Sequence, residues 1–168
     1  MKRTTTILTA ILLTASFTFF CSCKKSYKNT DQLATLGSTT ISGTVYAILA
    51  DTIGATGNQY APAGTVINAW IDSREFLFYT DSIAPYARKY YTATVDANGK
   101  YFLTVDVSLY QGAIVNIEPA GFKYNQVRKE TSAPYAVYTV TKTYTSIAFP
   151  VGVVHDSSSV QDIMYTFN

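Results

Sequence analysis

The chain has 168 residues, with 13 Lys and Arg against 11 Asp and Glu and a formal net charge of +2. A protein this close to neutrality lacks the basic surface that grips nucleic acid, so we expect no nucleic-acid partner. Hydrophobic residues make up 48% of the sequence, which is enough to bury the core of one ordinary domain.

The amino-terminal segment is typical of a bacterial secretory signal. Lys2 and Arg3 precede an uncharged apolar run over residues 7–20, which is shorter than the roughly 20 residues of a transmembrane helix. An uncleaved membrane anchor is therefore the weaker alternative. Loss of Lys2 and Arg3 with the signal peptide would lower the 13 basic residues to 11, equal to the acidic ones.

The residues that follow resemble the lipobox of bacterial lipoproteins. Ser22 stands directly before Cys23, whereas the bulky Phe20 stands before the competing Cys21. The resemblance implies cleavage before Cys23, lipid (palmitate included) on that residue, and attachment to the outer membrane, with the periplasmic or surface side left open. A Cys21–Cys23 disulfide is disfavoured because two Cα atoms so spaced in an extended chain lie near the upper limit for bridging.

The chain thus divides into a signal peptide over residues 1–22, lipidated Cys23 with a polar tether over 23–38, and a β-domain over 39–168. Within this domain, alternation of apolar and polar residues predicts strands. We expect them at residues 41–49, 64–71, 91–96, 101–107, 113–118, 135–149 and 163–167. Residues 50–62 and 72–90 are expected to be loops, the second long enough to hold a short helix.

Turn signals separate these strands. Asn98 and Gly99 lie between residues 91–96 and 101–107, and Asn-Gly supplies the positive φ angles that a tight hairpin requires. We therefore predict a hairpin there. For the whole domain we predict an all-β fold, an antiparallel Ig-like or transthyretin-like β-sandwich of about seven strands.

Four stretches resemble the carboxypeptidase regulatory-like family, whose domains are transthyretin-like β-sandwiches. They lie within residues 39–128 and read Ile41-Ser-Gly-Thr-Val45, Ala61-Pro-Ala-Gly-Thr-Val-Ile-Asn-Ala69, Thr94-Val-Asp-Ala-Asn-Gly-Lys-Tyr-Phe-Leu-Thr104 and Ala120-Gly-Phe122. The resemblance implies that alternate residues of the second strand face the core. The inward residues would be Thr65, Ile67, Ala69 and Ile71, and the outward ones Val66, Asn68 and Trp70.

Candidate catalytic and metal-binding residues are sparse. His155 lies beside Asp156 and Ser157, but catalytic triads are assembled from separated segments, so an exposed turn is the better interpretation. Asp96 and Asn98 echo the start of a calcium loop, although no Glu follows to complete it. We expect no catalytic residue, no cofactor and no enzyme activity, with a hydrolase as the least favoured alternative.

Aromatic residues carry the functional hypothesis. The sequence has 14 tyrosines, and the aromatic residues in or beside the long 72–90 loop include Trp70, Tyr79, Tyr86, Tyr90 and Tyr91. Such a cluster stacks on sugar rings or forms a protein-binding patch, unless the tyrosines simply cover a sheet. We expect a lipid-anchored envelope protein that binds a glycan or a partner protein, with an adhesin or pilus-type assembly module as the alternative.

Overall fold

The computed structural model describes residues 34–50, 53–54, 56–77 and 86–167. This part of the chain is built of β-strands in two sheets, so the expected all-β sandwich is confirmed. Cys23, the signal peptide and Tyr79 lie outside the described residues. Within the described part, no helix is long and apolar enough to cross a membrane.

Among the described residues, the strands follow one another along the chain with one short 3-10 helix, η2, between them. They are β1 (Leu36–Ala47), β2 (Gln59–Tyr60), β3 (Val66–Asp72), η2 (Ser73–Phe76), β4 (Arg88–Thr94), β5 (Lys100–Ser108), β6 (Ala113–Pro119), β7 (Phe122–Lys129), β8 (Val137–Thr145), β9 (Phe149–Val153), β10 (Ser158–Val160) and β11 (Ile163–Phe167). The short helix falls inside the 72–90 segment, as the sequence predicts. β1 begins at Leu36 and so takes in residues that the sequence assigns to the tether.

The larger sheet has seven strands and is organised around β1. On one side β1 pairs antiparallel with β5 and β2, and on the other it pairs parallel with β10 and then β11. β11 continues the sheet through β8 to β7. The first described strand therefore lies beside the last ones, a long-range arrangement that alternation alone does not reveal.

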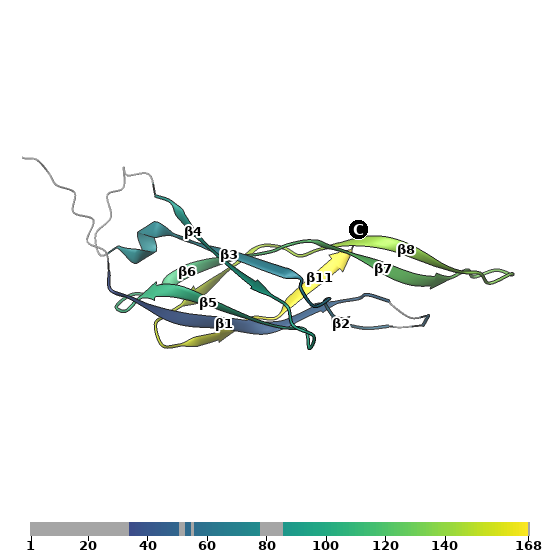
Figure 1. Ribbon diagram of the computed structural model, residues 1–168, viewed down its shortest axis with the longest axis horizontal. Coiled ribbons are helices and arrows are strands. Elements are labelled where there is room, and N and C mark those ends of the chain that lie inside the picture. Colours follow the sequence, from purple (N-terminus) through teal and green to yellow (C-terminus); the bar gives the residue numbers. More distant parts are fainter. Residues whose placement is uncertain (1–33, 51–52, 55, 78–85, 168) are drawn as a thin grey trace, which may run out of the picture. The chain divides into compact units, whose positions relative to one another are not determined.

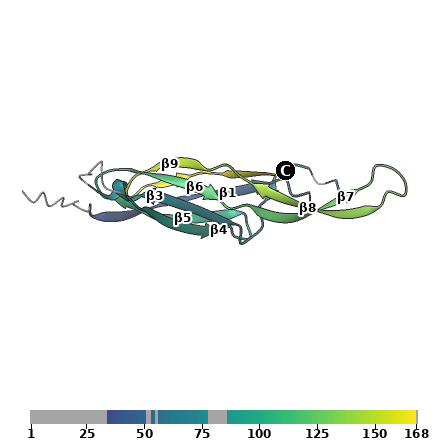
Figure 2. The same cartoon turned by 90° about the horizontal axis from the view of Figure 1, so that it is seen from above.

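The smaller sheet contains β4, β3, β6 and β9 in that order, and all its neighbours are antiparallel. Figures 1 and 2 show the two sheets packed in layers, with β3, β4 and β6 over β1 and β5. One hydrophobic cluster fills the space between the layers and draws side chains from both sheets. Sheets packed in this way are held mainly by the apolar surface that they bury against each other.

The second strand behaves as the family resemblance implies. Thr65 is 6% exposed, and the inward residues of β3 are fully buried, whereas the side chains on the other face are partly exposed. The buried residues of β3 are Ile67, Ala69 and Ile71, and the partly exposed ones include Val66, Asn68 and Trp70. The predicted orientation of this strand, with Trp70 on the outside, is confirmed.

Three tyrosines, Tyr101, Tyr144 and Tyr165, are among the largest buried side chains. Each hydroxyl donates a hydrogen bond of 2.7–2.9 Å to a main-chain carbonyl oxygen. The acceptors are the carbonyls of Gln161, Ile48 and Ala120, respectively. Because a buried hydroxyl without a partner is costly, these bonds allow a polar ring to fill an apolar core.

The predicted hairpin at residues 91–107 is wrong in its pairing. The turn forms, with Gly99 at φ 71°, and the Asp96 carboxylate accepts the N–H groups of Asn98 and Lys100 at 2.8 Å. However, β4 pairs with β3 and β5 pairs with β1, so the two strands belong to different sheets. The turn therefore carries the chain from one sheet to the other.

The segment 135–149, predicted as one long strand, is two strands in different sheets. β8 ends at Thr145 and pairs with β7 and β11, whereas β9 begins at Phe149 and pairs with β6. In Figures 1 and 2 the turn end of the β7–β8 hairpin has no other described strand beside it. That end carries the exposed side chains of Tyr135, Val137 and Tyr138.

Candidate functional site

The outer face of the four-stranded sheet carries Trp70 near its centre. The strand register places Tyr90 of β4 and Asn116 of β6 on either side of Trp70, with Pro150 of β9 beyond Asn116. Residues directly opposite each other in a sheet share a face, so these residues form one row across it. Together with Arg88 and Glu118, this row makes up what we call the Trp70 surface.

Two charged side chains hold the Trp70 ring. The guanidinium of Arg88 lies over the ring at 3.9 Å from its centroid, close enough for a cation–π contact. The indole Nε1 donates a hydrogen bond of 2.8 Å to Glu118 Oε1. The ring is therefore fixed on an open sheet face, beside a Tyr90 ring that is 67% exposed.

The short helix η2 adds a second group of polar side chains at the end of β3. Asp72 accepts the Arg74 N–H at 3.0 Å and forms an ion pair with the Arg74 guanidinium at 2.7 Å. Hydrogen bonding to Arg74 lowers the pKa of Asp72 below its ordinary value. The same guanidinium lies 5.4 Å from the centroid of the Tyr86 ring. Arg74 thus brings Tyr86 and Asp72 together.

Tyr91 does not join the Trp70 surface. It alternates with Tyr90 along β4, faces the other way and packs against the hydrophobic core. Its hydroxyl donates to Asp106 Oδ2 at 3.2 Å, and burial raises the pKa of Tyr91 to about 12. Of the aromatic residues singled out from the sequence, Trp70 and Tyr90 share a face, and Tyr86 lies against Arg74 instead.

The candidate calcium residues have a structural task. Asp96 Oδ1 accepts two main-chain N–H groups of the turn that joins the sheets, one of them from Asn98. His155 Nε2 lies 3.2 Å from Asp156 Oδ1, and Ser157 donates to the Val154 carbonyl. Across the described residues, His, Cys, Asp and Glu form no group of three or more that could hold a metal ion.

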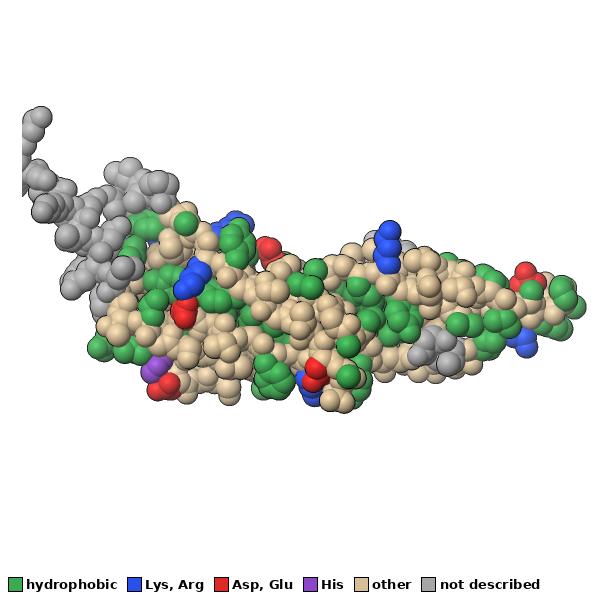
Figure 3. Space-filling view, viewed as in Figure 1, with side chains coloured by type: hydrophobic (Ala, Val, Ile, Leu, Met, Phe, Trp, Pro, Cys, Tyr) green, Lys and Arg blue, Asp and Glu red, His purple; other side chains and the backbone are tan. Residues whose placement is uncertain are grey.

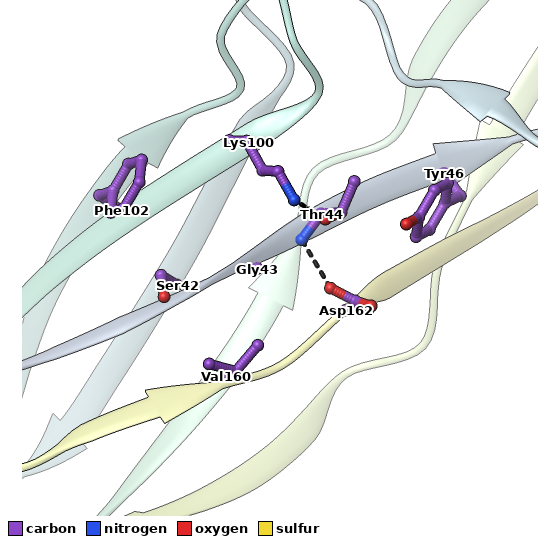
Figure 4. Close-up of a pocket in the computed structure, with 8 residues that line it drawn as sticks. All are labelled: Ser42, Gly43, Thr44, Tyr46, Lys100, Phe102, Val160 and Asp162. Carbon is purple, nitrogen blue, oxygen red and sulfur yellow. Dashed lines mark hydrogen bonds between the residues drawn. The ribbon is translucent and has the colours of Figure 1, made fainter.

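A groove crosses the outer face of the seven-stranded sheet. Its floor is the middle of β1, formed by the small residues Ser42, Gly43 and Thr44, and its volume is about 480 Å³. Figure 4 shows the larger side chains that border it, from β5 on one side and from β10 and the β10–β11 connection on the other. These bordering residues are Phe102 and Lys100, Val160 and Asp162, with Tyr46 farther along β1.

The strand beside β1 is interrupted at the groove. Between β10 and β11 the main chain leaves the regular ladder, and Asp162 Oδ1 accepts the Thr44 N–H at 2.7 Å. Across from it, Lys100 Nζ donates to Thr44 Oγ1. Both dashed lines in Figure 4 meet at Thr44. The arrangement places one carboxylate and one ammonium group on opposite sides of Thr44.

The sequence alone did not single out the groove residues. Asp162 is one of several carboxylates scattered along the chain, and it meets Thr44 across 118 residues. Phe102 and Lys100 alternate with buried core residues of β5 and fit an ordinary solvent-facing pattern. Alternation does mark them as outward, but only the pairing of β1 with β5, β10 and β11 brings them together.

The distribution of charged side chains does not point to another binding site on the face that Figure 3 shows. Figure 3 shows acidic and basic side chains singly or in small groups on the face in view, without a continuous field of one sign. The chain matches no protein-family model and no curated protein. The fold and the two outer faces therefore define the class: an all-β sandwich with an aromatic surface on one sheet and a polar groove on the other.

Proposed function

We propose that this protein is a lipid-anchored, non-enzymatic component of the cell envelope that binds a partner protein through the Trp70 surface. The observation that carries the proposal is the fixed, outward Trp70, held between Arg88 and Glu118 next to the exposed Tyr90. Trp, Tyr and Arg are the residue types that most often dominate binding energy at protein interfaces.

A protein partner suits this surface better than a sugar. The Arg88 guanidinium covers one face of the indole, so a pyranose ring that stacked on that face would first have to displace it. A protein partner can instead use the edge of the ring, the Arg88 donors and the Tyr90 hydroxyl together. Membership of the carboxypeptidase regulatory-like family and attachment to the outer membrane through Cys23 belong to the same proposal.

Site-specific cross-linking in living cells tests the partner. With a photoreactive phenylalanine derivative at position 90, we expect a defined cross-linked protein band, which disappears when Trp70→Ala is added. The matched control places the same group at Thr104, an exposed position of β5 in the other sheet, and should give no such band. If position 90 yields no protein adduct while a glycan array detects binding that Trp70→Ala abolishes, the surface binds sugar instead.

The anchor is tested separately. Growth with an alkyne analogue of palmitate should label the wild-type protein, and Cys23→Ser should remove the label whereas Cys21→Ser should leave it. Labelling that survives Cys23→Ser would contradict the proposed site of lipidation. This experiment does not depend on the identity of the partner.

An assembly module is the second candidate, and the β7–β8 hairpin favours it. Tyr135, Val137 and Tyr138 are 48–57% exposed at the end of the hairpin that has no neighbouring described strand. If these residues join copies of the chain, sedimentation should show oligomers whose size increases with protein concentration. The Val137→Lys variant should remain monomeric. A monomer at all concentrations would speak against this candidate.

A further inference from the structure

The groove on the seven-stranded sheet has a floor of small residues and borders of large ones. Ser42 lies opposite Phe102 on β5 and opposite Val160 on β10, so the three form one row with the smallest residue in the middle. Adjacent strands lie about 4.8 Å apart, and the two borders therefore stand on strands roughly 10 Å apart. A single extended polymer fits between borders at that separation.

The main chain of β1 is not available to a ligand in this groove. β1 pairs with β5 along one edge and with β10 and β11 along the other, and the Thr44 N–H at the interruption is bonded to Asp162. An extended peptide that binds by strand addition requires a free edge. A ligand lying over β1 must instead be recognised by side chains alone.

The side chains offer both kinds of hydrogen-bonding group with no net charge. Lys100 has three N–H donors, of which one is directed at Thr44, and the Asp162 carboxylate has a second oxygen beyond the one that Thr44 uses. One positive and one negative group on opposite borders cancel at a distance. Such a pair suits a ligand that is neutral but rich in hydroxyl groups, which both donate and accept.

Apolar and aromatic surface lines the same groove. Phe102 is 68% exposed and Val160 is 71% exposed, because both side chains face away from the core. Farther along β1, the Tyr46 and Tyr60 rings lie 5.9 Å apart. An exposed aromatic ring beside hydrogen-bonding groups matches the pyranose ring, which has apolar C–H faces and a polar edge. The volume of about 480 Å³ falls within the usual range of small-ligand sites, about 300–1,000 Å³.

We propose that the groove over Ser42 and Thr44 is a binding site for a neutral oligosaccharide. Phe102 stacks against a sugar ring, while Lys100 and Asp162 bind hydroxyl groups from opposite sides. The site lies on a different sheet from the Trp70 surface and does not depend on it. The protein can therefore hold a neutral polysaccharide on one face while a protein partner occupies the other.

An oligosaccharide array tests the groove with the full-length protein purified in detergent. The array carries neutral oligosaccharides, uronate-containing ones and extended peptides. We expect neutral oligosaccharides to bind, and Phe102→Ala and Asp162→Asn each to weaken the binding by about tenfold or more. Asn keeps a carbonyl oxygen for the Thr44 N–H, and a thermal unfolding curve like that of the wild type will show that each variant is folded. Trp70→Ala is the matched control and should bind as the wild type does.

Four outcomes would overturn the groove proposal. They are binding of no neutral oligosaccharide, preference for uronates, preference for peptides, and neutral-sugar binding that folded Phe102→Ala and Asp162→Asn leave unchanged. If, within the last of these outcomes, Trp70→Ala alone abolished sugar binding, the sugar site would lie on the other sheet. The partner protein is tested by cross-linking at position 90 and the groove by the oligosaccharide array. One proposal can therefore be contradicted while the other is supported.

Discussion

The outer faces of the two sheets differ in how their polar side chains are used. On the four-stranded sheet the antiparallel ladder is regular, and its polar groups pair with one another, as Trp70 does with Glu118 and Thr92 with Asn68. On the seven-stranded sheet the strand beside β1 is interrupted, and Asp162 replaces a main-chain acceptor. The first face is an open platform, and the second is recessed.

The difference shows how a β-sandwich acquires a concave site without an added loop. A continuous ladder uses every main-chain group and leaves a gently twisted surface whose relief comes from side chains alone. An interruption brings a side chain into the ladder and sets a charged group at the surface. On this reasoning, damage to the interruption should affect folding and the groove, whereas changes to the platform should affect mainly binding.

Gly43→Ala should have the largest effect on stability. A Cβ atom at residue 43 would lie 2.0 Å from the main-chain oxygen of Gln161, a residue held by its own N–H bond to the Ser42 carbonyl and by the Tyr101 hydroxyl. We expect a loss of about 3 kcal/mol, measured by urea unfolding. Gly152→Ala on the platform side is the matched control: nothing lies within 4 Å of its Cβ, so it should be neutral or slightly stabilising. Equal effects of the two changes would contradict the distinction between the faces.

Asp162→Ala should have the next largest effect. Thr44 is 3% exposed, and the substitution leaves its N–H without the carboxylate oxygen at 2.7 Å. The expected cost is about 2 kcal/mol, and Asp162→Asn should recover most of it. On the platform side, Asp72→Ala removes an exposed cap and ion pair, for which we expect about 1 kcal/mol or less. Urea unfolding of all three variants at one pH provides the comparison.

The buried Tyr101 should make the stability of the protein depend on pH, through its contact with the chain between β10 and β11. Its hydroxyl donates to the Gln161 carbonyl at 2.9 Å, and burial raises the pKa of Tyr101 from 10.0 to about 12. A phenol whose pKa is raised on folding stabilises the protein fully below the unfolded pKa, and that contribution is lost as pH rises through the folded pKa. Wild-type stability should therefore fall between pH 10 and about 12.

Tyr101→Phe separates the two contributions of this residue. Near about pH 8 it should cost about 1 kcal/mol, because the hydrogen bond to Gln161 is lost. Above pH 10 the wild type begins to lose the stability that the variant never had from this phenol, so the difference between them should shrink. Chemical unfolding at several pH values, with tyrosinate absorbance as a second signal, measures it. A constant difference over the whole range would contradict the assignment.

Much of the fold follows from residue alternation, but the pairing of strands does not. Alternation and the family resemblance place Ile67 inside and Trp70 outside. This is a local property, because successive side chains along a strand point to opposite faces of the sheet. The interruption at Asp162 joins residues 118 apart, and no local pattern encodes such a contact. The turn at Gly99 illustrates the limit: it forms as predicted, yet the two strands that it joins enter different sheets.

Strand β7 shows a second reason why the strands could not all be predicted from the sequence. Its position facing the interior is occupied by Gln126, which is fully buried, so the apolar alternation that predicts a strand is broken there. The amide is accommodated because Nε2 donates to the Tyr144 hydroxyl at 2.6 Å and to the Ile48 carbonyl at 3.3 Å. A buried polar side chain with its partners far along the chain looks, in sequence, like a surface residue.

Trp70→Phe should have the smallest effect on folding, and it tests whether the platform is built for binding. The change removes the 2.8 Å hydrogen bond from Nε1 to the exposed Glu118 but keeps an aromatic ring beneath Arg88. Because this bond lies at the surface, we expect a loss of about 0.5 kcal/mol in urea unfolding, and a double-mutant cycle with Glu118→Gln should give a coupling no larger. The yield of the cross-link from position 90 should fall strongly even though the free energy of unfolding changes little, since the indole edge would contact the partner directly. If stability instead fell as much as in Gly43→Ala, the indole would be a structural part of the sheet rather than a surface kept for a partner.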